Sequence, residues 1–171
     1  MLQKINSVFF LLLISIICTK AFAKETPLIT ADLGGSTGIN NGNTYQEMNL
    51  GVNVNFTDWL TWRNSAFQKS GSKIKTISGL DSSLRLVLGT RSNEGSFQFF
   101  IGPGYRWSSS SENSTAFAEA GLGGQYKGLG LSGGAKYFKY TKDRFDIDDV
   151  KMNPEDVTYF ISLSGSASFG K

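Results

Sequence analysis

The stretch from Tyr45 to Phe56, YQEMNLGVNVNF, decides the fold class. Apolar residues occupy every second position from Met48 to Phe56, and Asn or Gly occupies each position between them. Because successive side chains of a β-strand point to opposite faces, this segment predicts a strand with one apolar and one polar surface. From Lys24 onward the chain has no sustained 3.6-residue period and no run of 18 apolar residues, so we expect neither helical bundles nor helical membrane spans.

The same alternation recurs in eight segments, and their apolar faces carry no charged residue. These faces begin at Ile29, Met48, Leu60, Leu84, Phe97, Ala116, Leu129 and Val157. Short connections at 57–58, 92–96 and 127–128 alternate with long ones at 37–44, 69–79, 108–115 and 141–156. Short turns on one side and long loops on the other, with an even strand count, are typical of outer-membrane barrels. The pattern predicts an all-β fold, a closed eight-stranded antiparallel up-and-down transmembrane β-barrel with both termini periplasmic.

The first 23 residues have the layout of a secretory signal peptide. A basic start at Lys4 precedes an apolar stretch from Val8 to Cys18 and a small-x-small ending at 21–23. We expect residues 1–23 to be cleaved and residues 24–171 to form one outer-membrane barrel domain. The mature chain would then contain no Cys, so closure of the sheet, rather than disulfides, must stabilise an exported protein.

The polar faces predict what fills the barrel. They carry four acidic and four basic residues among many Gly, Ser, Thr and Asn: Asp32, Glu47, Arg63, Asp81, Arg85, Arg106, Glu119 and Lys136. Eight strands enclose an interior that side chains only just fill, and buried charges are tolerated when they are paired. We expect these residues to form an internal charge network that fills and neutralises the lumen. The alternative is that they line a gated ion path.

Aromatic residues cluster near the strand ends, which predicts two girdles at the membrane interfaces. Those near the short turns are Phe56, Trp59, Phe97, Tyr126 and Phe169, and those near the long loops are Tyr45, Trp107, Tyr137, Tyr140 and Tyr159. The alternative is that aromatics are simply good strand formers. Pro103 lacks a backbone N–H inside its predicted strand, so we expect a bulge or a bend there.

Two Gly-rich segments with aromatic ends, Phe99 to Trp107 and Ala120 to Tyr126, resemble strands of the small outer-membrane β-barrel superfamily of OmpA and OmpX type. The resemblance covers nearly all of Leu28 to Phe169. It implies residence in the bacterial outer membrane and contact with outer-membrane lipid, lipopolysaccharide and the assembly machinery. Members usually end on an aromatic residue that this machinery reads, whereas here Gly170 and Lys171 follow Phe169.

The composition argues against catalysis. Some barrels of this kind modify lipid A through a Ser activated by His or a similar base-assisted group. The chain has no His, so the serines at 162, 164, 166 and 168 have no obvious base. We expect no enzymatic activity and no cofactor. Without Lys4 and Lys20 the 17 basic residues fall to 15 against 14 acidic ones, so nucleic acid is not an expected partner.

Two of the long connections carry unusual charge. The acidic segment 141–156 offers oxygen ligands for Ca²⁺ or Mg²⁺ but lacks a calcium-loop motif, so we expect a solvated loop and no metal site. Lys69, Lys73 and Lys75 make the second connection basic, with no acid nearby in the sequence. It is either an ordinary solvated loop or a contact for anionic lipid headgroups.

We therefore expect a structural or surface-interaction role that acts through the extracellular loops on a ligand the sequence does not identify. The alternatives are a small, mostly closed ion or solute pore, a lipid A-modifying enzyme and a soluble periplasmic barrel.

Overall fold

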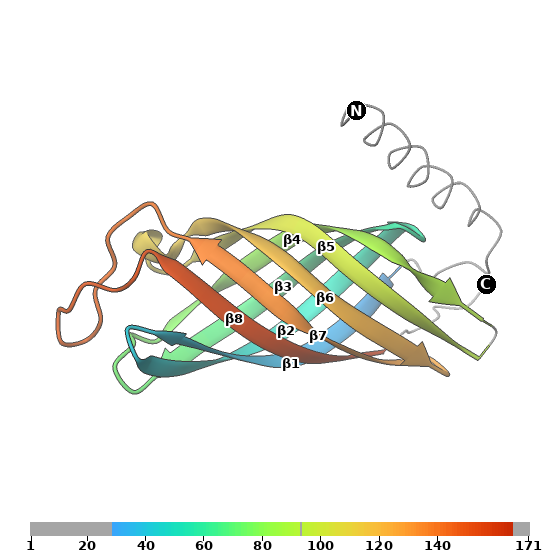
Figure 1. The fold of residues 1–171 in the computed structure, drawn as a ribbon, viewed down its shortest axis with the longest axis horizontal. Coiled ribbons are helices and arrows are strands. Elements are labelled where there is room, and N and C mark those ends of the chain that lie inside the picture. The colour runs from blue at the N-terminus through green and yellow to red at the C-terminus, as the bar shows by residue number, and fades with distance from the viewer. Residues whose placement is uncertain (1–28, 93, 166–171) are drawn as a thin grey trace, which may run out of the picture.

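The computed structural model describes residues 29–92 and 94–165, which form a closed antiparallel barrel (Figure 1). Its strands are β1 (Ile29–Asn40), β2 (Asn43–Thr57), β3 (Leu60–Gly71), β4 (Ile77–Arg91), β5 (Gly95–Ser108), β6 (Thr115–Tyr126), β7 (Leu129–Lys139) and β8 (Glu155–Gly165). Each strand pairs with the next along the chain, and β1 closes the barrel against β8. The predicted fold class is confirmed. The expected signal peptide lies outside the described residues, as does Phe169.

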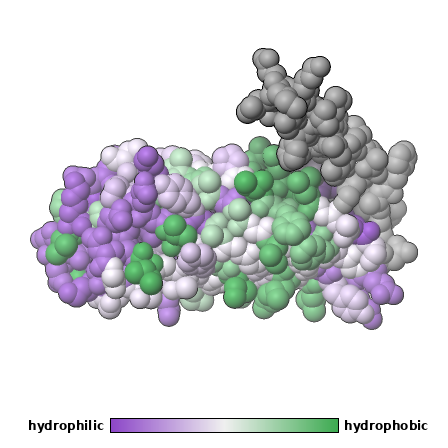
Figure 2. All heavy atoms as spheres, viewed as in Figure 1, coloured by the Kyte–Doolittle hydropathy of each residue, from purple (hydrophilic) through white to green (hydrophobic). Residues whose placement is uncertain are grey.

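Side chains alternate between the two surfaces of the barrel as the sequence pattern predicts. On β2, Met48 and Leu50 are 69% and 63% exposed on the outer surface, whereas Glu47 and Asn49 are buried inside. In Figure 2, apolar residues gather mainly in the right half of the visible face, and hydrophilic residues cover the left end. Within the described part of the chain, no helix is long and apolar enough to cross a bilayer.

Three of the four predicted long loops are present with shifted bounds, and the one predicted at 69–79 is shortened to 72–76. Segments 72–76, 109–114 and 140–154 lie at one end of the barrel, here called the loop end, and the second of them contains the short 3-10 helix η1 (Ser111–Asn113). The connections 58–59 and 127–128 lie at the opposite end, here called the turn end, as do Ser92 and Glu94 between β4 and β5. The described chain begins and ends at this turn end, where Ala31 pairs with Gly165.

The predicted long loop at 37–44 is wrong. β1 continues to Asn40 and β2 begins at Asn43, so only Asn41 and Gly42 connect them. Both residues have positive φ, 49° and 75°, as a tight hairpin turn of the primed type requires. Asn-Gly is the strongest short-range signal for that turn, and the sequence analysis overlooked it between two polar strand ends.

A bulge or a bend was expected at Pro103, and the pairing there shows no bulge. Pairing of β4 with β5 is interrupted between Ser83↔Gly104 and Leu86↔Ile101, and the register is the same on both sides of the gap. A short gap in the ladder thus accommodates the missing N–H without an extra residue. A register shift occurs instead between β2 and β3, at Asn55 and Thr57.

Candidate functional site: a charge network that fills the lumen

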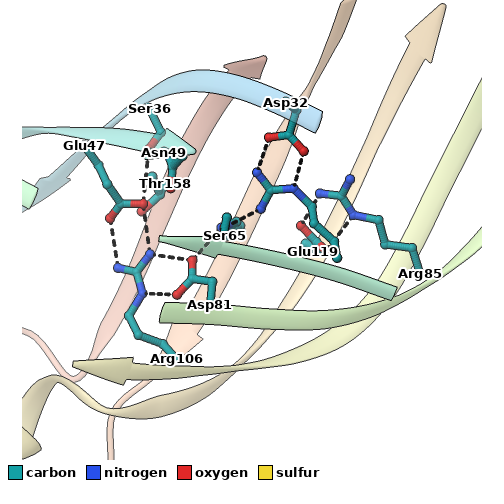
Figure 3. Close-up of polar contacts among 12 residues, drawn as sticks. Asp32, Ser36, Glu47, Asn49, Ser65, Asp81, Arg85, Arg106, Glu119 and Thr158 are labelled. Carbon is teal, nitrogen blue, oxygen red and sulfur yellow. Dashed lines mark hydrogen bonds and ion pairs between the residues drawn. The ribbon is translucent and has the colours of Figure 1, made fainter. Parts of the chain in front are cut away.

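The centre of the lumen holds a cluster of four charged side chains from four strands (Figure 3). Arg106 donates through Nε and Nη2 to the Asp81 carboxylate at 2.7 and 2.8 Å, and through Nη1 and Nη2 to Glu47 at 2.9 Å each. Lys136 Nζ lies 2.6 Å from the second oxygen of Asp81. None of the four side chains is more than 3% exposed, so the centre of the lumen is tightly packed around them.

Two further ion pairs lie next to this cluster on the turn side. Arg63 donates to both oxygens of Asp32, at 3.2 and 2.6 Å, and its Nη1 donates to Ser65 at 2.7 Å. Arg85 donates to both oxygens of Glu119 at 2.8 Å each. Two-pronged contacts of this kind are the strongest that a guanidinium makes with a carboxylate.

The structure thus places all eight residues of the expected charge network inside the barrel, each less than a tenth exposed. Their four positive and four negative charges balance, and each of the eight has an oppositely charged partner. Removing one partner from such a pair leaves a buried charge without compensation, which costs about 3 to 5 kcal/mol. Each ion pair of the network therefore depends on both of its members.

Phenylalanines on the polar faces fill the space between the charges, and the sequence analysis missed them. Each packs on a glycine, its direct register partner on the neighbouring strand: Phe67 on Gly79, Phe100 on Gly121, Phe117 on Gly104 and Phe160 on Gly134. A Cβ on Gly121 would lie 2.4 Å from the Phe100 ring, so only glycine leaves room for it. A Phe at an inward-facing strand position, opposite a Gly on the neighbouring strand, is the sequence signal that would have identified these residues.

These rings also contact the buried cations. The Arg106 guanidinium carbon lies 3.9 Å from the Phe67 ring centre and 4.4 Å from that of Phe138. The corresponding distance from Arg85 to Phe100 is 4.3 Å. Contact with a ring face stabilises a desolvated cation. Charges and rings together close the middle of the lumen.

The loop end of the lumen is closed by a second polar cluster. Lys69 lies in β3, buried, with Nζ 3.2 Å from Asp156 and 3.4 Å from the Tyr45 ring centre. The Tyr45 hydroxyl donates to the other Asp156 oxygen at 2.8 Å. The expectation of a loop lysine without an acid is therefore wrong for Lys69, because β3 extends to Gly71 and Asp156 reaches it from β8.

Two expected girdle residues belong to this interior rather than to the outer surface. Tyr45 is buried because it shares the inward register of β2 with Glu47, and Tyr140 is buried beneath the loop that follows β7. The structure places seven others on the outer surface: Phe56, Trp59, Phe97, Trp107, Tyr126, Tyr137 and Tyr159. Their role at a membrane interface stays a prediction.

The loop 140–154 is fastened across the mouth of the barrel. Asn40, beside the β1–β2 turn, accepts from the backbone N–H of Asn153 at 3.0 Å, and Asn41 donates to the Lys151 carbonyl at 2.6 Å. The exposed Lys73 lies 3.0 Å from Asp148 and accepts from the backbone of Ile147 through its carbonyl. Lys73 has no acid nearby in the sequence, and its partner Asp148 arrives from another loop.

Arg144 anchors the inner side of this loop. Its guanidinium carbon lies 3.3 Å above the Tyr140 ring centre, and Nη2 donates to the Asn153 carbonyl at 2.6 Å. Burial lowers the pKa of Arg144, and burial raises the pKa of Tyr140 to about 12. Both shifts reflect the cost of a charge in this enclosed position.

The acids of the loop have structural partners. Asp146 accepts from the backbone N–H groups of Asp148 and Val150 at 2.8 and 2.9 Å, which makes the tight turn at the loop tip. Asp143 pairs with Lys151 at 2.8 Å. In the stretches that the structure describes, no group of three or more His, Cys, Asp or Glu side chains could hold a metal ion.

The same loop presents apolar side chains at its tip, which the sequence analysis also missed. Phe145, Ile147 and Val150 are 47%, 53% and 53% exposed. Figure 1 shows that the loop extends farther from the barrel than the other connections at this end. These side chains are thus held away from the apolar surface of the barrel.

The turn end of the lumen contains a polar recess of about 100 Å³. Its walls include Thr30, Asn53, Ser132 and Ser162, and it reaches Arg85. The Ser132 and Ser162 hydroxyls hydrogen-bond to each other at 2.7 Å. The carboxylates of Asp32 and Asp58 also line this recess, and the sequence contains no His.

Three solved structures that match this fold are membrane barrels. Neisserial surface protein A matches with a TM-score of 0.55 and 10% identity over 81% of this chain and 96% of that one. The outer membrane enzyme PagL matches with a TM-score of 0.53 and 12% identity, over 80% and 99% of the two chains. A de novo designed transmembrane β-barrel matches with a TM-score of 0.50 and 13% identity, over 83% and 99%. No family model and no curated protein matches the sequence. At these identities the likeness shows the fold, which is that of the small outer-membrane barrels.

Proposed function

We propose that this chain is an integral protein of the bacterial outer membrane that acts through its extracellular loops, as a structural or surface-interaction protein. Residues 1–23 serve as the export signal and are cleaved before Lys24. The barrel resides in the membrane because closure satisfies the backbone hydrogen bonds of every strand where no water is available. The apolar outer surface then faces hydrocarbon, and the loop end faces the medium.

The filled centre of the lumen is the observation that supports this proposal. Arg106 and the carboxylates that hold it are almost fully buried, so side chains occupy the barrel at this level. The surface that remains available for recognition is the loop end, where an ordered loop presents Phe145, Ile147 and Val150. Exposed apolar side chains on an ordered support commonly mark contact sites for other molecules.

Loop replacement tests this function. Segments 72–76, 109–114 and 140–154 are each exchanged for Asn-Gly, the turn that already joins β1 to β2. The shortened protein should fold, shown by a gel migration that shifts only on boiling, and should fail to restore the surface phenotype of a deletion strain. Restoration by the loopless barrel would refute a role for the loops.

A pore is the second candidate, favoured by the recess that leads from the turn end to Arg85. Planar-bilayer recording of the wild-type protein and of the Arg85→Gln and Glu119→Gln variants tests it. Conductance that appears on neutralisation would identify the ion pair as a gate. Absence of conductance in all three proteins would eliminate the pore.

Lipid A modification is not part of the proposal, although one protein with this fold is an outer membrane enzyme. A base-assisted serine mechanism of the usual kind needs a His that this sequence does not contain. Lipid A from cells with and without the protein should have identical mass spectra. A difference that depends on the protein would overturn this assignment.

A further inference from the structure

Asn64 on β3 and Ser82 on β4 form a polar pair on the outer surface of the barrel. The two residues are direct register partners. Their neighbours along each strand point inward: Arg63 and Ser65 flank Asn64, and the buried Asp81 and Ser83 flank Ser82. Asn64 and Ser82 therefore face outward, and both are half-buried by the side chains around them.

Apolar and aromatic side chains surround this pair. Trp62 and Ala66 are its outward neighbours along β3, and Leu80 and Leu84 are its neighbours along β4. Across the sheet, Asn64 pairs with Val52 of β2, and Ser82 pairs with Tyr105 of β5. The pair is thus a polar island within the apolar outer surface.

The hydrogen-bonding capacity of this island is only partly used. The Trp62 indole donates to the Ser82 hydroxyl at 2.9 Å. Between Ile29 and Gly165, with residue 93 left aside, the side-chain amide of Asn64 makes no hydrogen bond to another residue. Acyl chains offer no donor or acceptor, so an outward amide in a membrane is unfavourable until another molecule supplies one.

We propose that the outer surface of β3 and β4 binds a second copy of this chain in the same membrane, with Asn64 at the centre of the interface. This rests on the membrane residence proposed above. Two copies inserted with the same orientation are related by a two-fold axis along the membrane normal, so residues of equal depth meet.

Asn64 is suited to such an axis because an amide is self-complementary. Each amide donates an N–H to the carbonyl oxygen of Asn64 of the second copy and accepts one in return. The small side chain of Ala66 beside it allows the two sheets to approach closely, as small residues do at other membrane interfaces. Phosphatidylcholine, the lipid of the vesicles used in the test below, has no N–H donor and does not provide this reciprocal pair.

Disulfide trapping tests the interface. The chain from Lys24 onward contains no Cys, so Ala66→Cys and Ala135→Cys each introduce a single thiol on the outer surface. Ala135 is the matched control, because β7 lies opposite β3 in the barrel. Both proteins are placed in phosphatidylcholine vesicles and oxidised. The expected result is several-fold more disulfide-linked dimer from the Ala66→Cys protein, and equal yields would overturn the interface.

A second variant tests the role of the amide. Adding Asn64→Leu to the Ala66→Cys protein should reduce the dimer to the yield of the Ala135→Cys control, since leucine is compatible with lipid but cannot form the reciprocal hydrogen bonds. Heat-modifiable gel migration verifies that this variant is folded. An unchanged dimer yield would overturn the assignment of Asn64.

Vesicle flotation separates this inference from the proposed function. Protein that floats with the vesicles but yields no specific dimer overturns the interface and leaves membrane residence intact. Protein that stays in the aqueous fraction, folded and without detergent, overturns both.

Discussion

Arg106 of β5 and Asp81 of β4 are direct register partners, and two hydrogen bonds of 2.7 and 2.8 Å join their side chains in the centre of the barrel. The same guanidinium also reaches Glu47 of β2, three strands away around the barrel. One side chain therefore connects neighbouring strands and opposite walls. This contact links distant parts of the barrel wall and fills the space between them.

Loss of Arg106 should be among the most damaging single changes in the protein. Arg106→Met leaves Glu47 short of its main partner and Asp81 with Lys136 alone, so we expect the free energy of unfolding to fall by about 3 to 5 kcal/mol. Urea titration in lipid vesicles measures this. Lys73→Met removes an exposed ion pair and should cost less than about 1 kcal/mol. Equal losses in the two variants would contradict the network.

The Phe100 ring should make position 121 intolerant of any side chain. In Gly121→Ala the new Cβ would lie 2.4 Å from the ring and 2.5 Å from the Gly133 carbonyl oxygen. Overpacking of this kind costs about 1 to 3 kcal/mol. Gly124→Ala in the same strand is the control, because its Cβ would meet its nearest atom at 3.4 Å. Equal stability of the two variants in urea titration would show that the ring does not require glycine there.

The Asn41-Gly42 turn should depend on glycine for its backbone conformation rather than for space. No atom lies within 4 Å of a Cβ built on Gly42, but its φ of 75° disfavours other residues. Gly42→Ala should cost about 1 to 2 kcal/mol. Gly35→Ala, in the extended part of β1, should be neutral or stabilising. Urea titration compares the two, and a neutral Gly42→Ala would mean that the turn adopts another conformation.

Tyr140 should make the stability of the loop end depend on alkaline pH. Burial favours the neutral form of Tyr140 and raises its pKa in the folded protein to about 12. The stabilisation that the neutral side chain provides is fully present below pH 10, the ordinary pKa of tyrosine. It is lost as the pH rises through the pKa of the folded protein. Tyrosinate absorbance in detergent should show a late titration step that Tyr140→Phe removes. Tyr159→Phe, an exposed position, should leave that step unchanged.

Strand number, strand direction and the two surfaces of the sheet could be predicted because they depend on neighbours in the chain. A strand places residues i and i+2 on one face, so Met48, Leu50 and Val52 identify their surface without reference to any other strand. The signal for the Asn41-Gly42 turn is just as local, but the polar residues around it were assigned to a long loop. Lys69 was misplaced in the same way, because the polar end of its strand was also assigned to a loop.

The sequence by itself determined which residues enter the lumen, because inward and outward positions follow from the two-residue repeat. Only the tertiary structure decided which of them meet. The stagger of strands in a closed barrel sets the height of each inward side chain, and no local pattern encodes that height. Arg106 therefore meets Glu47, Lys69 meets Asp156, and Asn64 remains on the outside without an internal partner.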